Sequence, residues 1–215
     1  MSSLSLFDSL PQPPVRLGAG LLALPGMALA HAGRLRDDIN TLTAQSAWRH
    51  MQVPSGHTMS AAQTSCGRLG WVSDAQGYRY SAHDPQNGRP WPAIPVLFLE
   101  LVRQACAQAG LDDLQPDTCL INRYEGQAHM SLHQDRNERD LTAPIVSISL
   151  GREALFLWGG VQRTDPVRTL RLRHGDVLIW WGPDRMNFHG VRRLDGPLHP
   201  DWGQARVNLT FRRAG

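Results

Sequence analysis

The stretch that decides the fold is "RTLRLRHGDVLIWWG", residues 168–182. Two runs rich in Leu, Val, Ile and Trp flank the triplet His174-Gly175-Asp176, and these residue types favour strands. Gly175 indicates a tight turn, so we expect it to join two antiparallel strands. The stretch therefore predicts antiparallel β-structure in this part of the chain.

Similar short segments surround it from residue 117 onward, separated by Gly, Pro and Asp. They are "TCLINRY" (118–124), "HMSLH" (129–133), "PIVSISLG" (144–151), "ALFLWGG" (154–160), "FHGVRRL" (188–194) and "ARVNLTFRR" (205–213). Several short strands with closely spaced turn signals are typical of a sandwich or barrel. We expect residues 117–215 to form a mainly β core.

The N-terminal half has a different pattern of residues, which predicts helices and irregular segments. Residues 1–15, rich in Ser and Pro, predict a loose tail, and residues 18–24 predict a strand. Apolar side chains at helical spacing predict one helix over 28–45 and a second from Pro95 to Gly110. Residues 49–92 are irregular and predict a short hairpin at most. The fold class is therefore α+β, with helices that support a β core.

Composition restricts the class of protein without deciding it. A chain of 215 residues suits one domain, here over 16–215. The net charge of +3, carried by Arg with no Lys, permits nucleic acid without requiring it. Three widely spaced cysteines form neither a disulfide framework nor a zinc knuckle and indicate a reducing cytoplasm.

One segment, "RLGAGLLALPGMALAHA" (16–32), is similar to a secretory signal. Asp8 and the Pro25-Gly26 break favour a folded segment instead. No run reaches the roughly 20 apolar residues of a membrane span.

Three His-x-Asp triplets are candidates for a metal site: residues 133–135, 174–176 and 199–201. The second lies at the expected turn, and Pro200 places the third in a loop, so both are more typical of structural roles. His133 and Asp135 end a predicted strand, where residues two apart share a side. The first triplet is therefore the best candidate.

A metal needs a further ligand, and His189 opens another predicted strand. Two imidazoles and one carboxylate on one face of a metal form the facial triad of non-haem Fe(II) oxygenases. The same set can also bind zinc, and the residue types alone do not separate the two metals.

The segment 205–213 alternates apolar and polar residues. Its polar side presents Arg206, Asn208, Thr210 and Arg212, which an ordinary half-exposed strand would also do. Beside a metal, however, these guanidinium groups would bind a dicarboxylate in a bidentate manner. Asn122 and Tyr124, two apart on another strand, offer further hydrogen bonds.

Together the motifs closely resemble the AlkB-type Fe(II)/2-oxoglutarate dioxygenases that repair alkylated nucleic-acid bases. The resemblance rests on "CLINRY", "SLHQD", "APIVSISLG", "HGDVLIWWG", "FHGV" and "RVNLTFR", in that order, and on "TMSAAQTSCGRLGW", "QGYRYS" and "DPQNGRPWP" upstream. It covers nearly the whole chain from about residue 18.

The resemblance implies a double-stranded β-helix, or jelly roll, with an N-terminal nucleotide-recognition lid over about 49–92. It implies that iron is bound by His133, Asp135 and His189. The residues implied to hold the co-substrate 2-oxoglutarate are Asn122, Tyr124, Arg206, Asn208 and Arg212. Of these, Arg206 would bind the distal carboxylate and Arg212 the end nearer the metal.

The resemblance also implies the reaction. An N-methyl group on a base, as in 1-methyladenine or 3-methylcytosine, would be oxidised with O2 and 2-oxoglutarate, releasing formaldehyde, succinate and CO2. The base would be flipped out or offered single-stranded, in DNA and possibly RNA, and gripped by Trp71 and His133. Further substrate contacts are implied at Tyr78, Tyr80 and Arg163.

Two positions depart from the family pattern. Asn137 stands where a second carboxylate is usual, with Glu138 next to it, so we expect a weakened or shifted preference for cationic methylated bases. His129 stands where a permanently charged residue can occur, so a phosphate contact there would depend on pH.

Two alternative functions remain. A 2-oxoglutarate hydroxylase of a protein or small molecule would keep the chemistry and change the substrate. A non-catalytic jelly-roll module would bind nucleic acid without iron-dependent turnover.

Overall fold

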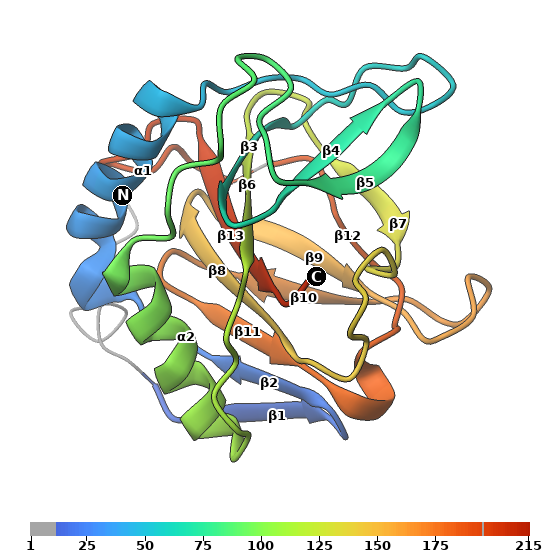
Figure 1. The fold of residues 1–215 in the computed structure, drawn as a ribbon. Coiled ribbons are helices and arrows are strands. Elements are labelled where there is room, and N and C mark those ends of the chain that lie inside the picture. Colours follow the sequence, from blue (N-terminus) through green and yellow to red (C-terminus); the bar gives the residue numbers. More distant parts are fainter. Residues whose placement is uncertain (1–11, 195) are drawn as a thin grey trace.

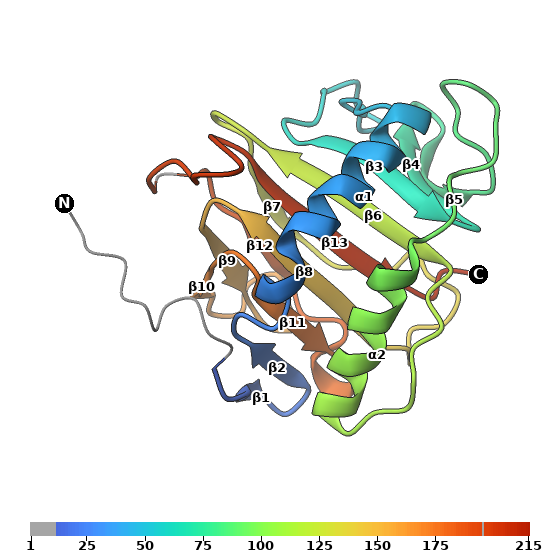
Figure 2. The same cartoon turned by 90° about the vertical axis from the view of Figure 1, so that its left-hand side faces the viewer.

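The structure is a computed structural model that describes residues 12–194 and 196–215. Helices α1 (Ala32–Gln45) and α2 (Val96–Ala109) lie side by side over one face of a large sheet (Figures 1 and 2). A 3-10 helix, η2 (Leu29–His31), leads into α1, and Gly110 ends α2 in the left-handed conformation with φ of 69°. Both predicted helices are therefore confirmed. Among the described residues, no helix is long and apolar enough to cross a membrane.

The large sheet has seven strands in the order β1-β2-β11-β8-β13-β6-β3. Their bounds are β1 (Val15–Gly18), β2 (Leu21–Leu24), β3 (Ala62–Gly67), β6 (Thr118–Tyr124), β8 (Ile145–Gly151), β11 (Val177–Trp180) and β13 (Arg206–Arg212). The pairings within it are antiparallel.

A second sheet has the order β10-β9-β12-β7, with bounds β7 (Met130–His133), β9 (Ala154–Trp158), β10 (Arg168–Leu172) and β12 (His189–Val191). It packs on the large sheet through Phe156, Trp158, Trp180 and other apolar residues. A separate hairpin, β4 (Gly70–Asp74) and β5 (Gly77–Ser81), lies at the upper right of Figure 1. A 3-10 helix, η3 (Gly182–Asp184), precedes β12. Two facing antiparallel sheets confirm the predicted mainly β fold.

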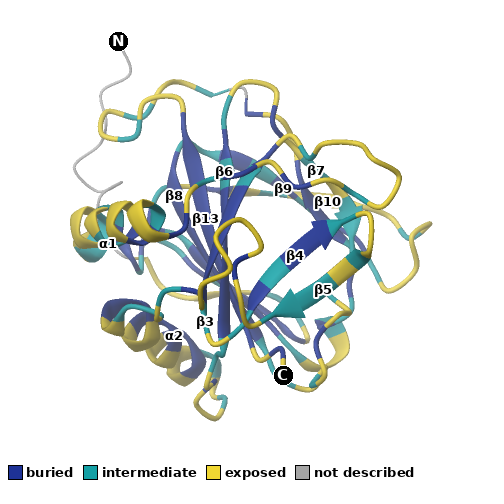
Figure 3. Ribbon diagram, turned by 45° about the horizontal axis from the view of Figure 1, so that its top comes forward, coloured by how far each residue is buried: buried dark blue, intermediate teal, exposed yellow. Residues whose placement is uncertain are grey.

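The structure shows where the alternating apolar and polar side chains of residues 205–213 lie, which the sequence alone left open. Val207, Leu209 and Phe211 pack in the apolar core beneath the helices. The intervening polar side chains are also buried, because the second sheet covers that face of β13 (Figure 3). The half-exposed alternative is therefore wrong, and β13 places polar groups inside the protein.

Several local expectations are corrected. The predicted strand over 18–24 is a hairpin, β1 and β2, interrupted at Ala19-Gly20, and β1 begins at Val15 inside the expected tail; the rest of that tail, 1–11, lies outside the described residues. The predicted turn at Gly175 does not join neighbouring strands, since β10 and β11 belong to different sheets. The hairpin expected within 49–92 is present as β4 and β5, but β3 was missed there and pairs with β6.

Candidate functional site

The pairing of β7 with β12 brings two imidazoles together. His133 and His189 are direct partners in this antiparallel pair. Gly190 permits the close approach, because a Cβ there would lie 2.6 Å from the carbonyl oxygen of Met130. The ring centroids of the two histidines are 4.4 Å apart. The sequence thus places one histidine on each of two strands, and the glycine allows them to meet.

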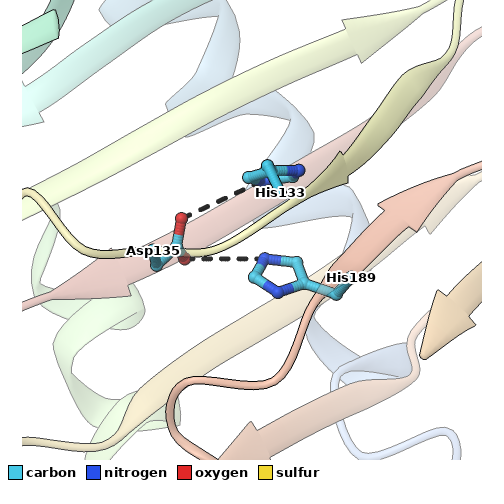
Figure 4. Close-up of side chains that lie close together, drawn as sticks. All are labelled: His133, Asp135 and His189. Carbon is cyan, nitrogen blue, oxygen red and sulfur yellow. Dashed lines mark ion pairs between the residues drawn. The ribbon is translucent and has the colours of Figure 1, made fainter. Parts of the chain in front are cut away.

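Asp135 completes the group, as Figure 4 shows. Its Oδ1 lies 3.9 Å from His133 Nε2, and its Oδ2 lies 3.7 Å from His189 Nε2. Ligand atoms of the three residues all lie within 4.8 Å of one another. Asp135 does not share a strand with His133 as predicted, because β7 ends at His133 and Asp135 belongs to the following loop. The predicted convergence nevertheless occurs.

Backbone hydrogen bonds fix which nitrogen of each ring can bind a metal. His133 Nδ1 lies 2.9 Å from the carbonyl oxygen of Ser131, and His189 Nδ1 lies 3.0 Å from that of Asn187. A carbonyl only accepts, so each Nδ1 carries the proton and each Nε2 keeps its lone pair. Burial, followed by the neighbouring His133, lowers the pKa of His189 to about 4. Each ring therefore points its Nε2 toward the position that a metal would occupy.

Arg212 holds the carboxylate of Asp135 in its anionic form. Its Nε and Nη2 donate to Asp135 Oδ2 at 2.9 and 2.7 Å. Burial alone would raise the pKa of Asp135, but the guanidinium of Arg212 beside it outweighs burial and holds the pKa well below its usual range. Two imidazoles and one carboxylate are the donor set that suits ferrous iron with open positions.

A cavity of about 850 Å³ lies in front of this group. It is lined by all but one of the site residues predicted from the sequence: Trp71, Tyr78, Tyr80, Asn122, Tyr124, His133, Asp135, Asn137, Arg163, His189, Asn208 and Arg212. The exception is Arg206, whose guanidinium carbon lies 5.2 Å from the ring centre of Tyr124. The predicted residues therefore converge on one place, with Arg206 behind its wall.

Two buried guanidinium groups, one lining the inner wall and one behind it, have nitrogen atoms that lack partners among the described residues. Arg206 is 1% exposed; its Nη2 donates to Ser149 Oγ at 3.0 Å, while its Nε and Nη1 have no acceptor. Arg212 Nη1 also lacks one. Unpaired buried guanidinium atoms are costly, and carboxylates are their natural acceptors. The wall therefore fits a small dicarboxylate beside the metal ligands.

Not every polar residue of the wall is free to bind a ligand. The amide nitrogen of Asn208 donates to Ser147 Oγ at 2.7 Å and to the carbonyl oxygen of Ile148 at 3.1 Å. Its Oδ1 accepts from Thr210 Oγ1 at 2.8 Å. Asn208 therefore stiffens the wall. Asn122 Oδ1 accepts from Gln63 Nε2 at 2.8 Å, which leaves its own amide hydrogens available.

The outer wall is formed by the β4–β5 hairpin and by exposed side chains. Trp71 and Tyr78 stack, with ring centroids 5.7 Å apart and an interplanar angle of 18°. Arg163 is exposed and donates to the carbonyl oxygen of Leu132 at 3.0 Å. Asn137 and His129 are exposed at the same cavity. Flat aromatic and cationic groups at one mouth suit a base with its phosphate.

Two important residues were missed in the sequence, as parts of a buried charge network. Glu138 accepts from Tyr80 Oη at 2.5 Å and from Arg185 Nη2 at 3.3 Å. Arg185, 2% exposed, also donates to the carbonyl oxygen of Asp135 at 2.8 Å. Glu138 was noticed only as the neighbour of Asn137. Arg185 gave no signal, because its partners come from distant segments.

Comparison with known proteins identifies the group to which the chain is related. The family model of the 2OG-Fe(II) oxygenase superfamily matches residues 20–212. The alpha-ketoglutarate-dependent dioxygenase AlkB of Escherichia coli (strain K12) is 50% identical over 199 residues, covering 93% of this chain and 92% of that protein. The human nucleic acid dioxygenase ALKBH1 is 30% identical over 129 residues, covering 59% of this chain and 32% of that protein.

A solved structure, described as "The structure of OsALKBH1", superposes with a TM-score of 0.82 at 28% identity, covering 94% of this chain and all of that one. The chain therefore belongs to the 2OG-Fe(II) oxygenase superfamily and, within it, to the AlkB alpha-ketoglutarate-dependent dioxygenases. The zinc alternative left open by the residue types gives way to iron, with 2-oxoglutarate as co-substrate.

Proposed function

We propose that this dioxygenase removes alkyl groups from ring nitrogens of nucleic-acid bases, such as 1-methyladenine and 3-methylcytosine, in DNA. The observation that supports it is one cavity that combines a His-Asp-His metal group, unpaired guanidinium atoms and an aromatic hairpin. Two relatives named as an AlkB dioxygenase and a nucleic acid dioxygenase agree with this substrate class.

His133, Asp135 and His189 would hold the iron through Nε2, a carboxylate oxygen and Nε2. Iron with 2-oxoglutarate and O2 would supply the oxidation of the alkyl carbon, which leaves as formaldehyde with succinate and CO2 as co-products. Arg206 and Arg212 would bind the two ends of 2-oxoglutarate, and Asn122, Tyr124 and Asn208 would shape its site. The protein contributes position and charge.

The base would be held at the outer wall, after it has left any duplex stack. Trp71 would stack on one face and His133 lie against the other. Tyr78, Tyr80, Asn137 and Arg163 would contact the base or its phosphates, and residues 49–92 would form the lid. The described cysteines are unpaired, so we place the reaction in the cytoplasm.

Anaerobic reconstitution with Fe(II) and 2-oxoglutarate, followed by oxygen and a panel of methylated oligonucleotides, tests the proposal. Formaldehyde and succinate in equal amounts, absent with unmethylated oligonucleotides, are expected. Succinate without formaldehyde from any methylated oligonucleotide would favour a protein or small-molecule hydroxylase. Oligonucleotide binding that ignores iron, without succinate, would favour a non-catalytic module.

A further inference from the structure

The acidic groups of the cavity are few. Among the described residues that line it, only Asp135 and Glu138 carry carboxylates. Arg136, Arg163 and Arg212 line the same cavity, together with four histidines. A substrate base therefore enters a site in which positive side chains outnumber negative ones. The question is whether either carboxylate remains available to a ligand.

Asp135 is fully occupied. Arg212 donates twice to its Oδ2, and its two oxygens face the Nε2 atoms of His133 and His189. Its side chain is only 10% exposed. The charge of Asp135 is therefore paired with Arg212 and directed at the metal position, and it is not available to a base.

Glu138 is occupied as well. Its Oε1 accepts from Tyr80 Oη and lies 3.4 Å from Arg212 Nε, while its Oε2 accepts from Arg185 Nη2. The side chains of Glu138 and Arg185 are each 2% exposed. Arg185 thus pairs with this carboxylate in the protein interior, with Arg212 shared between it and Asp135, and Glu138 offers no unpaired charge to a base.

Asn137 is the neighbouring polar group that a ligand can reach. It is exposed, it lines the cavity, and its amide has no hydrogen-bond partner within the described part of the chain. An amide both donates and accepts, whereas a carboxylate only accepts. It can therefore donate to the exocyclic carbonyl of a neutral base or accept from the exocyclic amine of a cationic one.

We propose, on the basis of the function inferred above, that Asn137 gives this enzyme a similar kcat/KM for neutral and cationic alkylated bases. The neutral class, which includes N1-methylguanine and N3-methylthymine, presents a carbonyl beside the methylated nitrogen. The cationic class, which includes N1-methyladenine and N3-methylcytosine, presents an amine. With both cavity carboxylates paired to arginine, no free anion favours the cations.

The test is turnover of four oligonucleotides of one sequence, each with one of these bases, by the iron-loaded enzyme. The measured quantity is kcat/KM for cationic bases divided by kcat/KM for neutral ones. In the parent enzyme this ratio is expected to lie within about tenfold of unity. Asn137→Asp is expected to raise it by roughly tenfold or more, because a charge-assisted hydrogen bond is about twice as strong as a neutral one.

Two variants control the interpretation. Asn137→Ala removes the amide and is expected to lower both classes with little change in the ratio. Asn40→Asp adds the same charge on an exposed position of α1, which does not line the cavity, and is expected to leave the ratio unchanged.

A parent preference for cations above about tenfold, or an unchanged ratio in Asn137→Asp, would overturn the inference while formaldehyde release still supported the proposed function. Formaldehyde from none of the four oligonucleotides, despite succinate production, would overturn the proposed function and the inference together.

Discussion

Two pairs of histidines in this protein have the same ring geometry and different chemistry. His133 and His189 have ring centroids 4.4 Å apart and an interplanar angle of 54°. His174 and His199 have the same separation and the same angle. Each pair includes residues from His-x-Asp triplets. Neither the triplet in the sequence nor the proximity of two imidazoles therefore distinguishes a metal site.

The hydrogen bonds at Nδ1 do distinguish them. In the first pair each Nδ1 faces a carbonyl oxygen and must donate. In the second pair the backbone N–H of Gly151 donates to His174 Nδ1 at 2.9 Å, and that of Asp201 donates to His199 Nδ1 at 3.1 Å. A neutral ring that accepts at Nδ1 carries its proton on Nε2. The second pair therefore presents two N–H groups where the first presents lone pairs.

The carboxylates of the triplets differ in the same way. Asp135 is held anionic by a guanidinium and faces both imidazoles. Asp176 accepts from the backbone N–H groups of Gly26 and Arg173 at 2.9 and 2.7 Å, and burial raises its pKa. It fixes the turn between the two sheets. Metal binding thus depends on what the carboxylate and Nδ1 are already bonded to.

The largest expected effect separates the pairs directly. His189→Gln removes a ligand lone pair and is expected to weaken Fe(II) binding by on the order of 100-fold or more, since even supporting groups are worth 10- to 100-fold. His174→Gln is expected to leave Fe(II) affinity unchanged, because the Gln carbonyl can still accept from Gly151. Anaerobic titration calorimetry measures both. Similar losses in the two variants would contradict the distinction.

Sequence reasoning located the first pair because strand periodicity and residue chemistry agree there. His133 and His189 each lie on a short β-strand. Asp135 lies beside them as predicted, although it does so from a loop and not from the strand. The sequence predicts a turn at the triplet 174–176 and a separate loop at the triplet 199–201. Their side-by-side rings arise from tertiary packing, which no local pattern in the chain reports.

The same limit applies to the charge network and to the sheets. Glu138 and Arg185 are separated by 47 positions in the chain, so only the fold reveals their contact. Gly175 was correctly interpreted as a turn, but whether a turn joins strands of one sheet or of two depends on what covers them. The alternation along β13 predicted which side chains share a face. That both faces are buried could not be predicted, because one of them is covered by the second sheet.

A second difference between the regions concerns arginine. Arg206 has two guanidinium nitrogens without acceptors, whereas Arg152, which follows Gly151 in the chain, donates to the carbonyl oxygens of Gly196 and Pro197. Arg206→Gln is expected to raise the KM for 2-oxoglutarate by about 100-fold, since removing one partner of a buried charge pair costs about 2–5 kcal/mol. With saturating 2-oxoglutarate, kcat should change much less.

Arg152→Gln is the matched control, because its acceptors are carbonyl groups of the protein itself. Steady-state kinetics with varied 2-oxoglutarate should show its KM within about threefold of the parent value, as expected for a satisfied, partly exposed side chain. An unchanged KM in Arg206→Gln, with the fold intact by circular dichroism, would refute the assignment of Arg206 to the co-substrate.

The smallest expected effect concerns stability and belongs to the second pair. Burial, followed by the neighbouring His199, lowers the pKa of His174 to about 4, whereas an unfolded chain has a histidine pKa near 6.5. Between these values the unfolded state binds the extra proton, so this contribution to stability is present above about pH 6.5 and is lost as pH falls toward 4. Partial exposure of the ring reduces the expected loss to about 1 kcal/mol between pH 7 and pH 5.

Urea unfolding of the metal-free protein at pH 7, 6 and 5, with and without His174→Gln, measures this loss. His189 is common to both proteins, so its own titration cancels in the difference. The parent should lose about 1 kcal/mol more than the variant over this range, because Gln cannot take up the proton. Parallel stability curves would show that His174 is not constrained to its neutral form. The hydrogen bond accepted by Nδ1 would then no longer explain why this pair lacks metal-binding lone pairs at Nε2.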